Sequence, residues 1–313
     1  MLLPIFLHIK KLMYISFAQN DLCYYIRMKN LDTLLKEIFS NKNASLKERL
    51  LGGMMNETNI ITSEGKDYVL FMPQGNANDV VDRKEEKFVQ KIASDLGITS
   101  KNIYFDVDSG IKCHEFIDGI SLNKIDEFDY DAVAKMLKTF HSSKTKSHND
   151  YKPFARLAEY YNLVVEFTKL GDDFYELLDV LKENQIFLEE QELVLSHNDF
   201  QRSNIVKSSD GKYYMIDFEF VGNNDEIYDI AAFGNNSVSE GRKLLDAYFN
   251  YSPTTDQIKR YYLWRIFISL QWCLMALIKD NNGEGKIHGI DFLGVSQFFL
   301  ANAKEANENL KNA

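Results

Sequence analysis

The pattern of apolar and polar positions changes along the chain. Up to about residue 117, short apolar runs are separated by polar or glycine-containing turns, and such runs predict strands. Beyond that point, longer segments carry apolar positions three and four apart, which predict amphipathic helices. The strands expected in the first part are 59–62, 68–72, 102–107 and 111–116. The fold class that follows is α+β, with a small antiparallel sheet first and a mostly helical remainder.

Helix signals are spread over the whole chain. Asp79 is a suitable N-cap for a helix that Gly97 ends, and this is the main helix expected beside the sheet. The complete set of predicted helices is 31–39, 44–50, 79–96, 130–141, 154–168, 172–184, 226–233, 257–279 and 293–310.

Polar clusters interrupt the apolar pattern between Leu195 and Phe220. Strands are expected at 193–195, 205–207 and 213–216, with a hairpin turn at 208–211. Asp199 and Asn204 then lie on a loop between strands, and Asp217 lies at a strand end. Two carboxylates and one amide oxygen should therefore meet at one edge of a small sheet.

This grouping suits phosphoryl transfer. Magnesium takes hard oxygen ligands, and a further carboxylate must orient the attacking hydroxyl and accept its proton. In protein kinases the catalytic Asp is followed, after four residues, by a metal-binding Asn, and later by the Asp of Asp-Phe-Gly. The chain repeats that order, with Glu219 in place of the glycine. We assign Asp199 as catalytic base, and Asn204 and Asp217 as magnesium ligands; the alternative is a polar hairpin whose side chains only satisfy turns.

Three short motifs carry a resemblance to a known family. His197-Asn198-Asp199, Ile216-Asp217-Phe218-Glu219-Phe220 and Tyr228-Asp229-Ile230-Ala231 resemble those of choline and ethanolamine kinases, which are relatives of aminoglycoside phosphotransferases and protein kinases. The resemblance runs from about Leu51 to the C-terminus. It implies a bilobal protein-kinase-like fold, with a nucleotide-binding lobe at 28–117 and a catalytic, substrate-binding lobe at 118–313. His197 and Asp229 would support the catalytic loop from behind.

The same resemblance implies a nucleotide site in the first lobe. Gly52-Gly53-Met54-Met55-Asn56 is similar to the family's Gly-Gly-x-x-Asn loop, so Gly52, Gly53 and Asn56 would bind ATP, although a plain hairpin is an equally good interpretation of the glycines. The hinge would be 115–119, where the backbone of Glu115 and Ile117 meets adenine.

One position departs from the family pattern. Relatives of the choline type carry an Arg on the third strand, which holds the α- and β-phosphates, and Glu86 on the following helix would be its partner. This chain has Phe71 there, and a phenyl ring cannot pair a phosphate. Either another cation, such as Lys66 or Arg83, takes its place, or nucleotide binding is weaker.

The segment 257–279 is apolar and rich in aromatic residues. Trp264 and Phe267 are three apart and share a helix face, and aromatic faces bind quaternary ammonium groups. The resemblance implies that this pair forms a choline cage. Phe292 would add a third wall, and Glu219 would either help to hold the metal or face the cationic substrate. The alternative is ordinary core packing.

Composition narrows the class of protein. The formal charge is −10 and no Lys/Arg-rich block occurs, which argues against a nucleic-acid partner. Three distant cysteines fit a reducing cytoplasm, and no uncharged apolar run is long enough to predict a membrane span. Residues 1–27 are interpreted as a start-site extension, because Met28 begins a more ordinary N-terminus; a short packing segment is the alternative.

Together these patterns predict a small-molecule kinase that uses ATP and Mg²⁺. Choline is favoured over ethanolamine as the substrate. Other acceptors, such as an aminoglycoside, a sugar or homoserine, form a second hypothesis. A pseudokinase that only binds nucleotide is a third, motivated by Phe71. The oligomeric state is not indicated by the sequence.

Overall fold

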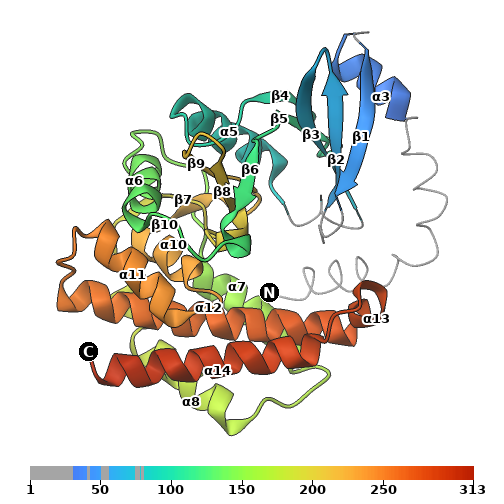
Figure 1. Ribbon diagram of the computed structural model, residues 1–313. Helices are drawn as coiled ribbons and strands as arrows, with labels where there is room; N and C mark the ends of the chain where they lie inside the picture. Colours follow the sequence, from blue (N-terminus) through green and yellow to red (C-terminus); the bar gives the residue numbers. More distant parts are fainter. Residues whose placement is uncertain (1–30, 41–42, 51–55, 75–77, 79–80) are drawn as a thin grey trace. The chain divides into compact units, whose positions relative to one another are not determined.

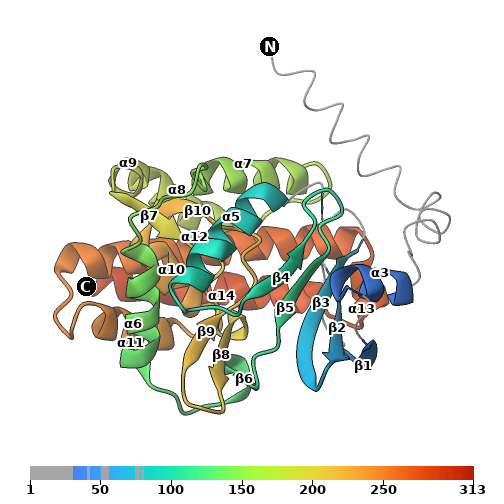
Figure 2. The same ribbon diagram turned by 90° about the horizontal axis from the view of Figure 1, so that it is seen from above.

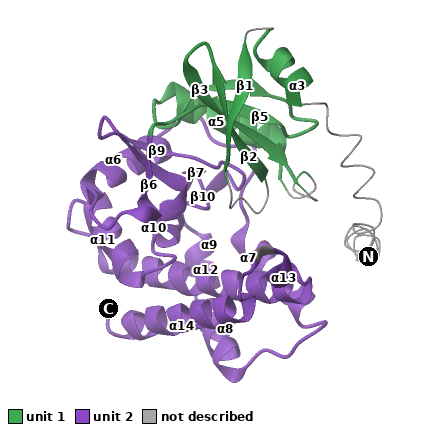
Figure 3. Cartoon of the chain, turned by 45° about the vertical axis from the view of Figure 1, so that its right-hand side comes forward, with its two compact units in different colours: residues 1–118 green, residues 119–313 purple. Residues whose placement is uncertain are grey.

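The computed structural model describes residues 31–40, 43–50, 56–74, 78 and 81–313. The chain divides into two compact units, residues 1–118 and 119–313 (Figure 3). The proposed start-site extension, residues 1–27, lies outside the described residues.

The first unit is built on a five-stranded antiparallel sheet with the spatial order β1-β2-β3-β5-β4. Among the described residues of this unit, two helices accompany the sheet. The elements are α3 (Leu31–Ile38), β1 (Ala44–Leu50), β2 (Asn56–Ser63), β3 (Lys66–Pro73), α5 (Arg83–Asp95), β4 (Asn102–Phe105) and β5 (Lys112–Glu115). The four strands predicted for this part of the sequence are confirmed.

Alternation along the strands sorts the side chains onto two faces of this sheet. Helix α3 covers one face, where Leu34 and Leu35 pack in a fully buried cluster with Leu70 and Cys113. Lys112 and His114, the neighbours of Cys113 on β5, point to the opposite face of the sheet, where side chains of helix α5 contact them. The α3 side of the sheet therefore faces an apolar core, whereas the α5 side carries buried polar residues.

Two predicted features of this unit are wrong. The segment Ala44–Leu50, predicted as a helix, is the edge strand β1, because its backbone pairs with β2 along nearly its whole length and that pairing overrides the helix propensity of its residues. The main helix begins at Arg83 and not at 79. Its N-cap is Asp82, whose carboxylate accepts hydrogen bonds from the backbone N–H groups of Lys84 and Glu85.

The second unit is mostly helical. Its helices are α6 (Tyr130–His141), α7 (Pro153–Val164), α8 (Asp172–Glu183), α9 (Gln185–Glu189), α10 (Glu226–Phe233), α11 (Val238–Tyr248), α12 (Thr255–Asn281), α13 (Glu284–His288) and α14 (Phe292–Lys311), with short 3-10 turns η1 (Leu122–Lys124) and η2 (Arg202–Asn204). Helices α12 and α14 lie side by side along the whole unit, joined through α13 (Figures 1 and 2). Helices α9, α11 and α13 were not predicted.

Helix α12 is the central element of this unit. It contacts α7, α8, α10, α11 and α14, and its apolar residues point in all directions. By length and a mean hydropathy of 1.4 it could span a membrane, but 72% of that stretch is buried inside the protein. Burial on all sides is what a core helix of a globular unit needs, so the hydropathy alone is weak evidence for a membrane span.

Two small sheets lie among these helices. One has the order β6-β8-β9 and the other pairs β7 with β10, all antiparallel. Their strands are β6 (Gly119–Ser121), β7 (Leu193–Ser196), β8 (Ile205–Ser208), β9 (Tyr213–Met215) and β10 (Gly222–Asp225). The predicted β8–β9 hairpin is confirmed, and the segments between these strands hold the polar residues that the sequence singled out.

Candidate active site

The loop after β7 brings Asp199 and Asn204 together. The chain leaves the strand at Ser196, and Asn198 adopts a left-handed conformation with φ 63°, which turns the backbone sharply. The 3-10 turn η2 then folds back, so that Asn204 Nδ2 donates to Asp199 Oδ2 at 2.8 Å and to the Asp199 carbonyl at 2.9 Å. Because the amide nitrogen of Asn204 is engaged there, its oxygen is the atom left to act as a metal ligand.

The segment after β9 brings Asp217 to the same hairpin. The backbone N–H of Ile216 donates to the Asn204 carbonyl at 2.9 Å. His197 Nε2 donates to the Ile216 carbonyl, also at 2.9 Å. Asp217 follows with φ 67° and has an exposed side chain. A positive φ at a non-glycine residue is costly, and such conformations concentrate at functional sites.

The pKa of Asp199 is shifted in the direction a general base needs. Burial raises the pKa of this carboxyl well above its usual range, and the nearby carboxylate of Asp217 raises it further. Hydrogen bonds from Gln201 and Asn204 oppose the shift, because they stabilise the charged form. A carboxylate with a raised pKa is a stronger base toward a substrate hydroxyl.

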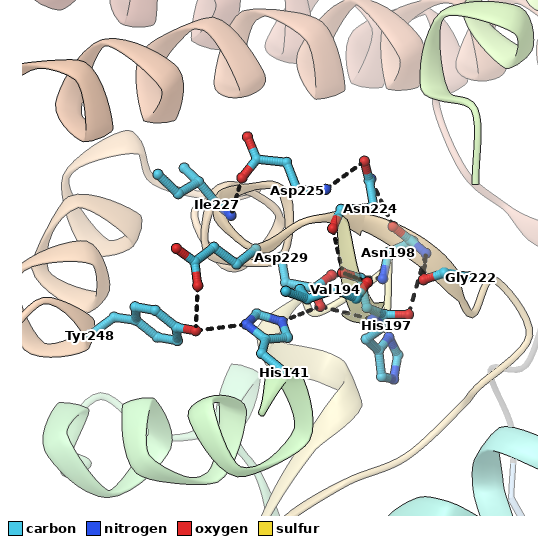
Figure 4. Close-up of polar contacts among 12 residues, drawn as sticks. His141, Val194, His197, Asn198, Gly222, Asn224, Asp225, Ile227, Asp229 and Tyr248 are labelled. Carbon is cyan, nitrogen blue, oxygen red and sulfur yellow. Dashed lines mark hydrogen bonds and ion pairs between the residues drawn. The ribbon is translucent and has the colours of Figure 1, made fainter. Parts of the chain in front are cut away.

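Asp229, on helix α10, holds the catalytic loop (Figure 4). Its side chain is fully buried. Oδ1 accepts from the backbone N–H of Asn198 at 2.6 Å, and Oδ2 accepts from the backbone N–H of His197 at 2.8 Å. His141 Nε2 also lies 3.0 Å from Oδ2, and its Nδ1 lies 2.9 Å from the Tyr248 hydroxyl. The buried side chain of Asp229 therefore fixes the turn that orients Asp199.

His197 ties the two halves of the site together. Burial lowers the pKa of His197, so the ring is neutral and its proton is on Nε2, where it is donated to Ile216. The ring also packs against Phe218, with centroids 5.1 Å apart. His197 therefore connects the residues before Asp199 to both neighbours of Asp217.

The donor set suits a hard divalent cation. Asp199, Asn204 and Asp217 offer carboxylate and amide oxygens, which are the ligands that magnesium prefers. Among the described residues, no three His, Cys, Asp or Glu side chains are grouped to hold a metal ion. A magnesium ion here would therefore depend on the Asn204 oxygen and on phosphate oxygens as well as on carboxylates, as in a site where metal and nucleotide bind together.

A cavity opens beside Asp199 within the second unit. It contains about 470 Å³ of empty space, including solvent at its mouth. Its walls are mainly aromatic and apolar, and amide groups are the main other polar groups. The lining residues are Tyr151, Tyr160, Asn198, Asp199, Phe220, Tyr228, Ala232, Asn235, Ile268, Gln271, Trp272 and Met275.

Comparison with known proteins agrees with this geometry. The family model described as choline/ethanolamine kinase matches residues 47–261. The chain belongs to the choline/ethanolamine kinase family. It is therefore a small-molecule kinase.

Three relatives illustrate the family. The chain is 25% identical to protein LicA of Haemophilus influenzae over 261 residues, which are 75% of this chain and 74% of the relative. The crystal structure of choline kinase LicA from Streptococcus pneumoniae covers 90% of this chain, over 98% of its own, with TM-score 0.65 and 22% identity. A structure of LicA in complex with AMP covers 91% of this chain and 99% of its own, with TM-score 0.68 and 21% identity. The expected kinase-like fold is confirmed by these likenesses.

The aromatic pair predicted to face the substrate lies elsewhere in this kinase. Trp264 and Phe267 are 1% and 0% exposed, and neither lines the cavity. Their rings pack on Tyr228, and the Trp264 indole N–H donates to Asp225 Oδ2 at 2.7 Å. The alternative interpretation, core packing, describes both residues, and Tyr228 stands between them and the cavity.

Two further residues predicted for substrate binding also lie outside the cavity lining. Phe292 is 4% exposed at the start of α14, with Lys279 Nζ 5.8 Å from its ring centroid. Glu219 is 8% exposed and precedes Phe220, which does line the cavity. The aromatic lining residues come from α7, α10, α12 and two loops. Phe220 and Tyr228 stand in motifs of the sequence, whereas only the fold groups them with Tyr151, Tyr160 and Trp272.

The residues predicted to bind the nucleotide differ in their position and exposure within the first unit. Gly52 and Gly53 lie outside the described residues. Asn56 is buried as the first residue of β2, Glu115 is exposed at the end of β5, and Ile117 follows, half-buried, in the connection to the second unit.

Glu86 is the most strongly connected of the predicted nucleotide-site residues. It is 1% exposed on α5 and has two cationic partners. Arg83 Nη1 lies 2.7 Å from its Oε2, and Lys112 Nζ contacts its Oε1. Arg83 had been considered as a replacement cation, whereas Lys112 had not. Lys66, the other candidate, is exposed at the start of β3.

Proposed function

We propose that this kinase transfers the γ-phosphoryl group of ATP, with Mg²⁺, to the hydroxyl of a small amino alcohol, and that choline is its preferred acceptor. The observation that supports this most directly is the cavity beside Asp199. Residues 28–117 would bind the nucleotide, and residues 118–313 would hold the acceptor and the base.

The charge of the cavity fits a small organic cation. Among the described residues that line it, Asp199 is the only Asp, Glu, Lys or Arg. Five lining side chains are aromatic: Tyr151, Tyr160, Phe220, Tyr228 and Trp272. Aromatic faces attract cations by about 0.5–2 kcal/mol each. An aminoglycoside carries several positive charges, and the cavity offers a single carboxylate to balance them. The cavity therefore favours a cation with one charge.

The polar groups of the cavity favour a quaternary amine over a primary one. The trimethylammonium group of choline has no N–H to donate, so apolar and aromatic walls leave none of its groups unsatisfied. The primary ammonium of ethanolamine carries three donors that need acceptors, and a buried donor without a partner costs about 1–3 kcal/mol. Of the three amide oxygens in the lining, that of Asn198 already accepts from Asn224 Nδ2 at 2.8 Å, which leaves those of Asn235 and Gln271 as amide acceptors for three ammonium donors.

The residues of the hairpin have distinct roles in the proposed reaction. Asp199 orients the acceptor hydroxyl and takes its proton as the oxygen attacks, while Asn204 and Gln201 hold its Oδ2. Asn204 and Asp217 would hold the metal ion, which when bound would offset the negative charge of the phosphates. Asp229 and His197 keep the loop in the shape that this requires.

The family relationships support the nucleotide and the acceptor. LicA from Streptococcus pneumoniae is described as a choline kinase, and another LicA structure contains AMP. Both are similar to this chain over nearly its whole length. Cys113 and Cys273 are buried free thiols, which suits the reducing cytoplasm where ATP is available.

The test is ATP consumption by the full-length protein with Mg²⁺ and one acceptor at a time: choline, ethanolamine, an aminoglycoside, homoserine or none. We expect the highest kcat/KM with choline and only background turnover without an acceptor. A preference for a different acceptor would contradict the choline assignment. Nucleotide binding without turnover on any acceptor would favour the pseudokinase hypothesis.

Trp272 provides a test of the cavity itself. Trp272→Leu removes an aromatic wall, and we expect KM for choline to rise about 3- to 30-fold, equivalent to the 0.5–2 kcal/mol of a cation–aromatic contact, with KM for ATP unchanged. The matched control is Trp264→Phe, which changes a buried ring outside the cavity. Equal changes in KM for choline in both variants would place the acceptor elsewhere.

A further inference from the structure

The sheet of the first unit lacks a basic residue at the position where the family pattern predicts one. Phe71 occupies that position on β3 and is half-buried. In the register of the sheet, Phe71 pairs with Thr58 of β2 on one side and with Lys112 of β5 on the other. Directly opposite residues on antiparallel strands project to the same face and have Cβ atoms only about 4.5–5.5 Å apart.

Lys112 therefore extends from the neighbouring strand into the same space. Its side chain is 4% exposed, and its Nζ lies 5.3 Å from the centroid of the Phe71 ring. The amine reaches the Glu86 carboxylate on α5, which is the contact that a third-strand cation makes in kinases. The ring of Phe71 supports the amine from the side, since an ammonium over an aromatic face is attracted to it.

Arg83 completes the arrangement. Its Nη1 binds the other oxygen of Glu86 at 2.7 Å, and its Nε donates to Asn78 Oδ1 at 3.0 Å. Glu86 is thus held between two buried cations, one from its own helix and one from β5.

We propose that Lys112 has taken over the role of the third-strand basic residue, and that its amine binds the α- and β-phosphates of the nucleotide. The inference rests on the proposed use of ATP. Phe71 has become the packing support of that lysine, and Arg83 keeps Glu86 in place. The positive charge thus comes from β5 instead of β3, and it lies on the same face of the sheet, the one that α5 covers.

The experiment compares Lys112→Met, Phe71→Arg and the double variant with the unaltered full-length protein. Binding of ADP and of adenosine is measured by calorimetry, and kcat and KM for ATP are measured with the best acceptor. We expect Lys112→Met to weaken ADP binding by about 10- to 100-fold, the loss of a charged hydrogen-bonding partner, and to leave adenosine binding within about twofold. Phe71→Arg in the Lys112→Met background should recover most of the ADP affinity, because it restores the cation on β3.

The exposed Lys66 offers a matched control on the same sheet. Lys66→Met removes the same charge from the start of β3, and ADP binding should not change. If Lys112 served only as a counter-ion for Glu86, Lys112→Met would lower the melting temperature with ADP and adenosine affinities unchanged, and the proposal would be overturned.

Two further outcomes keep the test decisive. If Lys112→Met does not fold, the double variant is expected to fold and bind ADP; a folded double variant with no affinity for ADP would overturn the proposal. The failure of the proposed function is distinguishable, because then the unaltered protein itself would bind no ATP or show no acceptor-dependent turnover. A protein that turns over ATP normally in the Lys112→Met variant would refute only the role of Lys112.

Discussion

The carboxylates of Asp199 and Asp229, at the catalytic loop, and the buried carboxylate of Glu86 on α5 are stabilised in different ways. In the second unit, Asp199 and Asp229 accept hydrogen bonds mainly from neutral donors, namely backbone N–H groups and two side-chain amides. In the first unit, Glu86 is held by two cations, Arg83 and Lys112. The partners of Asp199 are within five residues of it, whereas Lys112 is 26 residues from Glu86.

The difference follows from what each carboxylate has to do. Neutral donors fix the direction of Asp199 while its pKa stays raised, so it can take a proton during the reaction. The two cations next to Glu86 fix the position of its carboxylate. The proposed base therefore has neutral partners, whereas Glu86, which anchors cations, has charged ones. Each of the following predictions tests one side of this contrast.

The largest effect is expected at Asp199. Asp199→Asn keeps the size of the side chain but removes the base, and we expect kcat to fall by about 10²- to 10⁴-fold, the usual contribution of general base catalysis. ADP affinity should be unchanged, because the nucleotide is assigned to the other unit. A kcat within tenfold of that of the unaltered protein, measured with saturating acceptor, would mean that another group takes the proton.

Glu86 tests the charged side of the contrast. Glu86→Ala leaves two buried cations without their carboxylate, and we expect a loss of about 3–5 kcal/mol in the free energy of unfolding, measured with urea. Asp95→Ala, in an exposed ion pair with Lys91 on the same helix, is the control and should cost about 0–1 kcal/mol. Similar losses of stability in the two variants would show that burial does not strengthen the ion pairs of Glu86.

Asp229 should show an intermediate effect on both stability and turnover. In Asp229→Asn the new NH₂ group faces a backbone N–H donor, so we expect about 2–3 kcal/mol less stability and a kcat lowered by about tenfold, with KM for ATP unchanged. The exposed Glu192, next to β7, gives the control Glu192→Gln. A stability loss with an unaltered kcat would mean that Asp229 supports the fold but not the aim of Asp199.

The catalytic hairpin could be predicted from the sequence because its geometry is local. Asp199, Asn204 and Asp217 lie within a short stretch, and hydrogen bonds inside that stretch bring them together. The pairing of Lys112 with Phe71 depends instead on the register between β3 and β5, which are about forty residues apart in sequence. No spacing rule relates such residues, so the sequence revealed that Phe71 was unusual but not which side chain compensates for it.

Helix α12 shows a second limit of sequence patterns. Trp264 and Phe267 lie on a stripe of the helix that Ile268, Gln271 and Met275 continue, and these three later residues line the cavity. Periodicity gives the face of a helix but not the turn at which the face meets a cavity. That position is set by Tyr228 of α10, which covers the earlier turn.

The smallest effect concerns a buried histidine beside the Lys112 cluster. Burial, with a smaller effect of the Lys112 charge, lowers the pKa of His114 to about 3. The folded protein keeps His114 neutral below pH 6.5 while the unfolded chain takes up a proton, so the free energy of unfolding falls as the pH falls from 6.5 towards 3. At pH 5 this linkage costs about 2 kcal/mol.

His114→Gln should remove that share of the acid sensitivity, which is measured as the difference in urea unfolding free energy between pH 7 and pH 5. His197, whose pKa burial also lowers, should keep part of the sensitivity in the variant, because it belongs to the other unit. The exposed His148 gives the control variant His148→Gln, which should leave the difference as it is. If His114→Gln behaves like the control, the side chain next to Lys112 is not held neutral, and the α5 side of the sheet is more open to water than the structure shows.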